Sequence, residues 1–274
     1  MTLADFHPWL ERWRLTPDGA PFSSTWSRLL PVTRDGRALM LKAAMADQEV
    51  HGSAFLAGYA GRGAVEVVER EADAVLLERA AGPRSLSQVA AEAGEDAAFR
   101  ILCKGVETLQ AAPGPFPVEP LPLSAWFSIL PQAAAHVGGT GVYAEAARLL
   151  ERLLATTTGE APLHGDLHAG NLLDGGEGRG WLAIDPKGLR GDPVSDHAMM
   201  LFPGPPPGGV AAPEVVVGRA GRVAALANLP PDRLLGWAFC VAAQYAGWFH
   251  GSPMGEAMMA IALRLSREEV LAGI

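Results

Sequence analysis

Segment 163–186 limits what this chain can fold into more than any other part of it. It reads Leu-His-Gly-Asp-Leu-His-Ala-Gly-Asn-Leu-Leu and, after a glycine-rich turn at 174–180, Trp-Leu-Ala-Ile-Asp-Pro. The pattern predicts a polar loop followed by two apolar strands that form a hairpin. Asp166 and Asn171 lie five positions apart on the loop, and Asp185 closes the second strand. The segment therefore places three oxygen-bearing side chains around one hairpin.

This spacing suits phosphoryl transfer. One carboxylate accepts the proton of an attacking hydroxyl, while an amide and a second carboxylate hold magnesium. Oxygen ligands fit because Mg²⁺ is a hard cation. We therefore predict that Asp166 is the general base, or at least orients the substrate hydroxyl, and that Asn171 and Asp185 bind the metal.

The His-Gly-Asp-x-x-x-x-Asn loop and the metal aspartate after it resemble those of the aminoglycoside phosphotransferase family of small-molecule kinases. The Ile-Asp-Pro form is most similar to the streptomycin 6-kinase (hydroxyurea resistance) branch, and the resemblance extends from about Phe22 to Ala198. It implies an α+β, two-lobed, protein-kinase-like fold, with a small antiparallel β lobe that includes one helix and a larger, mainly helical lobe. It also implies ATP and Mg²⁺ as cofactors, and transfer of the γ-phosphoryl group to a hydroxyl of a small cationic molecule, such as the aminoglycoside streptomycin.

Two charged residues match the kinase pattern upstream. Lys42 ends the apolar strand Ala-Leu-Met-Leu-Lys, in a chain with only 3 lysines and 19 arginines. A kinase needs an ammonium group there for the α- and β-phosphates, held by a glutamate on a helix. Glu49 is the matching candidate. Considered alone, Lys42 would be an exposed strand end.

The remaining nucleotide contacts are predicted from short segments. The turn 21–27 has no glycine-rich loop, but Ser23 and Ser24 can offer hydroxyl and backbone N–H groups to phosphate. Segment 78–82 is predicted to be the hinge, where the backbone of Glu78 and Ala80 would contact the adenine edge. The hinge also serves as the connection between the lobes, and both functions are compatible.

Several residues near the motif are expected to support it. His164 is predicted to shape the loop through backbone hydrogen bonds, and His168 is given the same role. Asp196 matches the family aspartate that caps backbone N–H groups near the catalytic loop. Asp192 either does the same or faces a cationic substrate. Lys187 is given no role.

The aromatic residues of the second half have two interpretations. Core packing is the simpler one for residues at helical spacing. The other places Trp126, Trp237, Tyr245 and Trp248 at the border of the acceptor pocket.

We divide the chain into a nucleotide-binding lobe, 1–80, and a mainly helical lobe, 81–274, with the catalytic loop and the acceptor site. The first lobe is predicted to contain one helix at 48–59 and strands at 24–32, 37–42, 64–68 and 74–78. The second lobe is predicted to contain helices at 85–93, 95–111, 121–136, 142–156, 195–202, 213–227, 231–249 and 253–271, with a connector at 203–209.

Composition and charge limit which partners the protein can bind and where in the cell it is expected. The net charge is −8, and residues 81–274 hold 13 basic against 19 acidic side chains, which argues against nucleic acid. An acidic cleft would suit a cationic substrate, although the charge is also what keeps an ordinary protein soluble. No apolar run approaches the roughly 20 residues of a membrane helix. Two cysteines without metal spacing favour a cytoplasmic protein. The oligomeric state stays open.

Three alternatives remain beside an aminoglycoside kinase. The first is a kinase of another small metabolite alcohol or amino-sugar. The second is a catalytically silent, kinase-like binding protein, although Lys42, Asp166, Asn171 and Asp185 are all present. The third is a metal-dependent hydrolase with His164, Asp166 and His168 as ligands, which leaves the other motif residues without a role.

Overall fold

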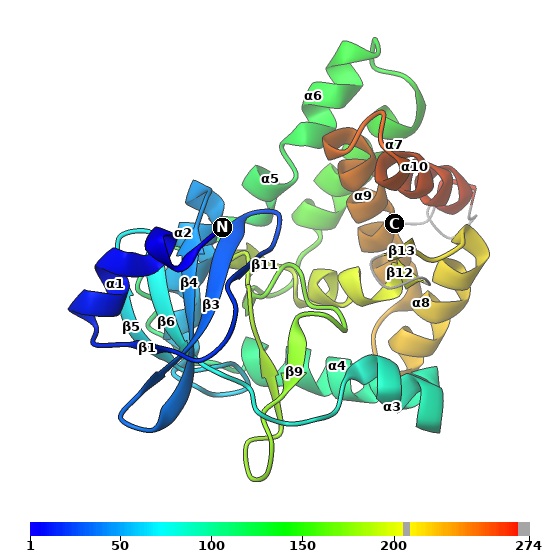
Figure 1. Cartoon of the computed structure of the whole chain (residues 1–274). Helices are drawn as coiled ribbons and strands as arrows, with labels where there is room; N and C mark the ends of the chain where they lie inside the picture. Colours follow the sequence, from blue (N-terminus) through cyan, green and yellow to red (C-terminus); the bar gives the residue numbers. More distant parts are fainter. Residues whose placement is uncertain (205–208, 268–274) are drawn as a thin grey trace.

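The N-terminal part of the chain folds around one antiparallel sheet in the computed structural model, which describes residues 1–204 and 209–267 (Figure 1). The sheet has six strands in the order β1-β3-β4-β6-β5, with β2 paired to the end of β3. The elements of this lobe are η1 (Leu3–Phe6), α1 (His7–Arg12), β1 (Thr16–Pro17), β2 (Phe22–Ser23), β3 (Ser27–Arg34), β4 (Arg37–Ala44), α2 (Asp47–Leu56), η2 (Ala57–Tyr59), β5 (Val67–Glu71) and β6 (Ala74–Glu78).

The long β3–β4 hairpin sets the register of this sheet. Its turn residues Asp35 and Gly36 both have positive φ, 52° and 78°, as a tight two-residue hairpin turn requires. Side chains alternate along β4, so that Leu41 and Ala43 pack on one face and Lys42 projects from the other. The face that carries Leu41 is covered by the N-terminal segment, through the buried side chains of Phe6, Trp13 and Leu15.

The described part of the C-terminal lobe is mainly helical, with three small two- or three-stranded sheets. Its elements are α3 (Leu86–Ala93), α4 (Glu95–Gln110), β7 (Leu121–Pro122), α5 (Leu123–Trp126), α6 (Ile129–His136), α7 (Gly141–Ala155), β8 (Ala161–Leu163), β9 (Leu172–Asp174), β10 (Trp181–Ala183), β11 (Leu189–Gly191), η3 (Pro193–His197), η4 (Met199–Leu201), β12 (Pro203–Gly204), β13 (Gly209–Val210), α8 (Pro213–Ala227), α9 (Pro231–Trp248) and α10 (Pro253–Leu265). Helix α9 lies at the centre and packs against α6, α7, α8 and α10, which is why it is apolar on nearly all sides. The predicted two-lobed α+β architecture is confirmed.

Two predicted helices differ from the observed elements. The helix expected at 121–136 begins instead with strand β7, which pairs with β11. The rest is broken between α5 and α6, because Pro131 has no N–H for the carbonyl of Phe127 and its ring would clash with that carbonyl. The helix expected at 195–202 is two short 3₁₀ turns, η3 and η4. The end of the helix expected at 253–271 and the middle of the connector at 203–209 lie outside the described residues.

The strand expected at 64–68 begins later, at Val67. The residues before it cross to the C-terminal lobe instead: Val65 donates to the carbonyl of Ala183 (3.1 Å), and Ala183 donates to that of Gly63 (2.9 Å). The sheet is therefore tied directly to strand β10 of the catalytic hairpin. In the described part of the chain, no helix is long and apolar enough to cross a membrane.

Candidate active site

The loop that carries Asp166 runs from the end of β8 to the start of β9, and Asp196 holds its first residues. The buried Asp196 carboxylate accepts hydrogen bonds from the backbone N–H groups of His164 (2.9 Å) and Gly165 (2.7 Å). Burial raises the pKa of Asp196 to about 6, although these two donors oppose the shift. Gly165 has φ +78°, and a Cβ there would collide with Leu189. The loop therefore enters the site along a fixed path.

His164 is fully buried, and both of its ring nitrogens face the backbone. Nε2 lies 2.8 Å from the carbonyl of Ile184, and Nδ1 accepts from the N–H of Asp166 (3.2 Å). These contacts assign the proton to Nε2 of a neutral ring. Burial lowers the pKa of His164 to about 3, so the ring stays neutral near pH 7. His164 thus joins the loop to the hairpin and offers neither nitrogen to a substrate or metal.

The Asp166 carboxylate is approached by polar groups from several elements. Lys187 Nζ lies 3.5 Å from Oδ2, and His168 Nε2 lies 3.8 Å from Oδ1. Tyr245 of α9 lies close to the same carboxylate, and its pKa is raised by burial and by the negative charge of Asp166. Burial raises the pKa of Asp166, and Lys187 and His168 partly offset the effect. The side chain keeps 15% of its surface exposed, so an incoming hydroxyl can reach it.

Asn171 and Asp185 lie side by side at the end of the β9–β10 hairpin, because the N–H of Ile184 donates to the carbonyl of Asn171 (3.0 Å). Asn171 Nδ2 donates to the backbone carbonyl of Asp166 (2.9 Å), which leaves Oδ1 for a ligand. Asp185 has φ +56°, an uncommon left-handed conformation for a residue with a side chain. Such strain often marks functional positions.

These two side chains fit a magnesium ion that is shared with phosphates. Mg²⁺ in kinases takes one or two carboxylate ligands and completes its shell with phosphate oxygens and water. An amide oxygen and a carboxylate supply that set. By contrast, residues 1–204 and 209–267 contain no group of three His, Cys, Asp or Glu side chains that could hold a metal by themselves. The metal-dependent hydrolase alternative is also disfavoured, because both ring nitrogens of His164 bond to backbone groups and are not free to bind a metal.

Lys42 and Glu49 bring the N-terminal lobe to this hairpin. Lys42 Nζ lies 2.6 Å from Glu49 Oε2 and 2.6 Å from Asp185 Oδ1, and Lys42 is only 3% exposed. Ser27 Oγ donates to the same Glu49 oxygen (3.1 Å). Burial would raise the pKa of Glu49, but its cationic partners, Lys42 first, outweigh it and the pKa is lowered. Lys42 is thus a buried interlobe cation and not an exposed strand end.

Lys187 is the main residue that sequence reasoning missed. It points into the site, 3.4 Å from Glu49 Oε1 and 3.5 Å from Asp166 Oδ2, with 14% of its side chain exposed. Burial by itself would lower the pKa of Lys187. The surrounding carboxylates, Asp166 first, outweigh burial, and the pKa is raised. The scarcity of lysine was the available signal, since two of the chain's 3 lysines contact Glu49.

The phosphate-side turn is built as a tight hairpin between β2 and β3. Ser24 Oγ accepts from the N–H of Ser27 (3.1 Å), and the N–H of Ser24 donates to the carbonyl of Ser27 (2.9 Å). Ser23 belongs to β2, paired with Arg28. Both serines are exposed at the tip. The Ser24 hydroxyl therefore stabilises the turn itself.

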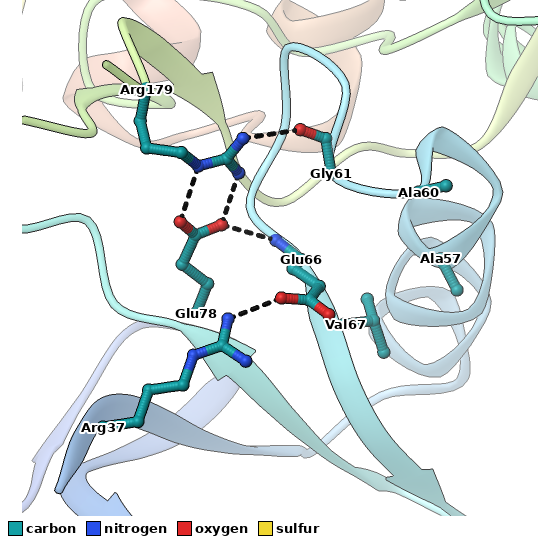
Figure 2. A pocket seen from close by; sticks show the side chains of 8 residues that line it. All are labelled: Arg37, Ala57, Ala60, Gly61, Glu66, Val67, Glu78 and Arg179. Carbon is teal, nitrogen blue, oxygen red and sulfur yellow. Dashed lines mark hydrogen bonds and ion pairs between the residues drawn. The ribbon is translucent and has the colours of Figure 1, made fainter. Parts of the chain in front are cut away.

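The predicted hinge is held by ion pairs on one side. Arg179, from the β9–β10 turn, donates to both Glu78 oxygens (2.9 and 2.6 Å) and to the carbonyl of Gly61 (3.2 Å), as Figure 2 shows. A cavity of about 580 Å³ lies here, lined by Arg37, Ala57, Ala60, Gly61, Glu66, Val67, Glu78 and Arg179. Glu78 of the predicted hinge lines this cavity, whereas Asp166, Asn171, Asp185 and Lys42 do not, so the cavity lies apart from the reacting groups. Ala80 lies half-buried in the linker after β6.

Asp192 has a saturated set of partners inside the fold. Its carboxylate accepts from Trp237 Nε1 (2.6 Å), Arg233 Nε (2.5 Å) and the N–H of Val194 (3.0 Å), and Asp192 is 3% exposed. The geometry therefore favours the structural interpretation over the substrate-facing one. Trp237, at 0% exposure, belongs to the core.

The other predicted aromatic residues form a surface next to Asp166. The Tyr245 ring lies 5.4 Å from that of Trp248 and 5.9 Å from that of Phe249, and Trp126 lies 5.1 Å from Trp248. Trp248 and Phe249 are 41% and 38% exposed. Aromatic surface thus extends from the Asp166 carboxylate to solvent.

Comparisons with known proteins show similarity to antibiotic resistance kinases. Residues 12–252 match the profile of a family described as aminoglycoside/hydroxyurea antibiotic resistance kinase. The chain is 39% identical over 247 residues to a streptomycin 3''-kinase of Klebsiella pneumoniae, covering 88% of this chain and 91% of the relative. It is 34% identical to a streptomycin 6-kinase of Streptomyces glaucescens, covering 68% of this chain and 62% of the relative.

Solved structures share the fold at low identity. The crystal structure of aminoglycoside phosphotransferase APH(4)-Ia has a TM-score of 0.65 at 15% identity and covers 99% of both chains. A mutant of that protein in complex with ADP and hygromycin B has a TM-score of 0.63 at 14% identity, over 97% of both chains. A choline/ethanolamine kinase family protein from Mesorhizobium loti has a TM-score of 0.62 at 15% identity, covering 94% of this chain and 91% of that one.

Proposed function

The chain belongs to the aminoglycoside/hydroxyurea antibiotic resistance kinase family, and on this basis we propose that it transfers the γ-phosphoryl group of ATP to a hydroxyl of an aminoglycoside, with streptomycin as the first candidate. The observation that carries the proposal is the convergence of Asp166, Asn171 and Asp185 on one hairpin, with Lys42 and Glu49 facing them from the other lobe. The ADP bound by the related structure supports the nucleotide.

In the proposed reaction, residues 1–80 would bind the nucleotide. Lys42 contacts the α- and β-phosphates while Glu49 holds it, and the exposed Ser23–Ser24 turn lies over the phosphates. The hinge backbone from Glu78 to Ala80 contacts the adenine edge. We propose a cytoplasmic location, where ATP is available as the donor.

Residues 81–274 would carry the chemistry. Asn171 and Asp185 hold Mg²⁺, which neutralises charge that develops on the phosphates. Asp166 accepts the proton of the acceptor hydroxyl as its oxygen bonds to the γ-phosphorus; the bond from that phosphorus to the β–γ bridging oxygen breaks, and ADP leaves. Because the transition state is loose, positioning by Asp166 matters more than its basicity.

The acceptor would approach along the aromatic surface of Tyr245, Trp248 and Trp126, since this surface leads from solvent to Asp166. Indole and phenol faces attract cations such as guanidinium and ammonium groups. A cationic sugar therefore suits the surface. A small neutral metabolite alcohol would gain less from it.

Mass spectrometry of streptomycin incubated with Mg·ATP and the purified protein tests the proposal. We expect a singly phosphorylated product, and NMR of that product identifies the hydroxyl. The site of transfer matters because the chain is similar to both 3''- and 6-kinases of streptomycin. Product from a metabolite alcohol or simple amino-sugar, and from no aminoglycoside, would favour the kinase alternative instead.

A further inference from the structure

Five charged side chains form a row of alternating sign between the metal side and the base. In order they are Asp185, Lys42, Glu49, Lys187 and Asp166. The nitrogen–oxygen distances along the row are 2.6, 2.6, 3.4 and 3.5 Å. The row crosses from one lobe to the other and back, because Lys42 and Glu49 belong to the N-terminal lobe.

Lys187 is the member of the row that the general kinase scheme does not include. That scheme pairs the strand lysine with the helix glutamate and contains no second lysine beside that glutamate. Here Glu49 uses one oxygen for Lys42 and turns the other towards Lys187. Lys187 thereby connects the position of helix α2 to the carboxylate of Asp166.

The backbone around Lys187 is also fixed from both sides. The N–H of Lys187 donates to the carbonyl of His164 (2.6 Å), in the catalytic loop. On the other side, His51 Nε2 lies 3.1 Å from the carbonyl of Gly188, and a Cβ on Gly52 would come within 2.1 Å of the carbonyl oxygen of Pro186. Segment 186–188 therefore fills the space between α2 and the catalytic loop.

We propose that Lys187 is a positioning residue, which holds the Asp166 carboxylate in the orientation that receives the acceptor hydroxyl and makes this orientation depend on α2. The distances of 3.4 and 3.5 Å exceed those of direct charge-assisted hydrogen bonds, about 2.7 to 2.9 Å. The ammonium group thus lies between the two carboxylates at nearly equal distances and attracts both. The proposal rests on the phosphotransfer activity proposed above.

The test compares Lys187→Met with Lys187→Arg and with Lys104→Met, where Lys104 is an exposed lysine of α4. ADP release is measured with Mg·ATP, with streptomycin and with water alone as acceptor, and AMP-PNP titration and thermal unfolding control for folding. We expect Lys187→Met to lower kcat by about 10- to 100-fold with little change in the KM for ATP, because a misplaced group costs turnover and not nucleotide binding. Lys187→Arg should recover part of the loss, and Lys104→Met should match the wild type.

A double mutant distinguishes positioning of Asp166 from direct contact between Lys187 and phosphate. If Lys187 acts through Asp166, adding Lys187→Met to Asp166→Asn should lower the residual rate little further. A full additional loss in that background would overturn the proposal, as would a folded Lys187→Met protein with wild-type kcat. Absence of ADP release by the wild type with any acceptor would instead count against the proposed kinase function.

Discussion

Two histidines near the catalytic loop are buried without charge, and they make the stability of the protein depend on pH. Burial lowers the pKa of His197 to about 4 and that of His164 to about 3. In an unfolded chain the pKa is near 6.5. Between these values the unfolded state takes up protons that the folded state does not, so the free energy of unfolding falls as the pH drops from 6.5. Asp196 acts in the opposite direction, since its pKa is raised to about 6.

His197→Phe should reduce this pH dependence. At pH 5 the neutral His197 costs about 1 to 2 kcal/mol of stability relative to pH 7.5, and the variant removes that share. Urea unfolding at both pH values measures the difference, with His136→Gln, at an exposed position, as the control. Parallel pH profiles for His197→Phe and the wild type would contradict the prediction.

At the residue scale, sequence could predict the groups that share a motif. Asp166, Asn171 and Asp185 lie within twenty residues, so the hairpin alone brings them together. Lys187 and Tyr245 could not be placed, because their contacts depend on where α2 and α9 pack. The partners of Asp192 are likewise supplied by α9.

At the scale of elements, the contact of α2 with the metal loop depends on a glycine. A Cβ on Gly52 would come within 2.1 Å of the carbonyl oxygen of Pro186, so either α2 or the loop must move. We expect Gly52→Ala to displace Glu49 from Lys187 and to lower kcat at least tenfold. It should also destabilise the fold by about 1 to 3 kcal/mol. Steady-state kinetics and thermal unfolding measure both effects.

Gly218 supplies the matched control. It lies within helix α8, and a Cβ there would meet no atom within 4 Å. Gly218→Ala should leave kcat unchanged and stabilise the protein by up to about 1 kcal/mol, because alanine is the better helix former. Unchanged kcat in Gly52→Ala would show that the close approach of α2 is not needed for activity.

Helix α9 carries the predicted acceptor surface, and Trp248 is its most exposed ring. Trp248→Ala should raise the KM for streptomycin about tenfold and leave the KM for ATP unchanged, because a lost cation–π contact costs about 1 to 2 kcal/mol. Leu263→Ala, at a 46% exposed position of α10, serves as the control. An equal rise in both KM values would point to a change in the fold rather than to a lost acceptor contact.

The predicted elements were most accurate where periodicity and stop signals agreed. The hairpin at Asp35–Gly36 and helices α8 and α9 follow from such signals. The helix predicted at 121–136 was wrong because its apolar spacing hid the effect of Pro131. The 3₁₀ turns after Asp192 were mistaken for an α-helix, since short apolar runs do not distinguish the two.

At the scale of the whole molecule, charged contacts join the lobes on two sides of the hairpin. Lys42 bonds to Asp185 at its metal end. Arg179 bonds to Glu78 at its turn, as Figure 2 shows. The two-lobed fold was predictable from the motif and its resemblance. The interlobe contacts were not, because they link residues more than a hundred positions apart.

In the proposed reaction, Asp166 receives the acceptor hydroxyl beside a bound nucleotide. This role is tested by streptomycin-stimulated ADP release from the wild type and from Asp166→Ala, with AMP-PNP titrated into both. We predict stimulation in the wild type, a loss of at least about a hundredfold in the variant, and similar AMP-PNP affinities. Full stimulated ADP release by a folded, nucleotide-binding Asp166→Ala protein would contradict this role of Asp166.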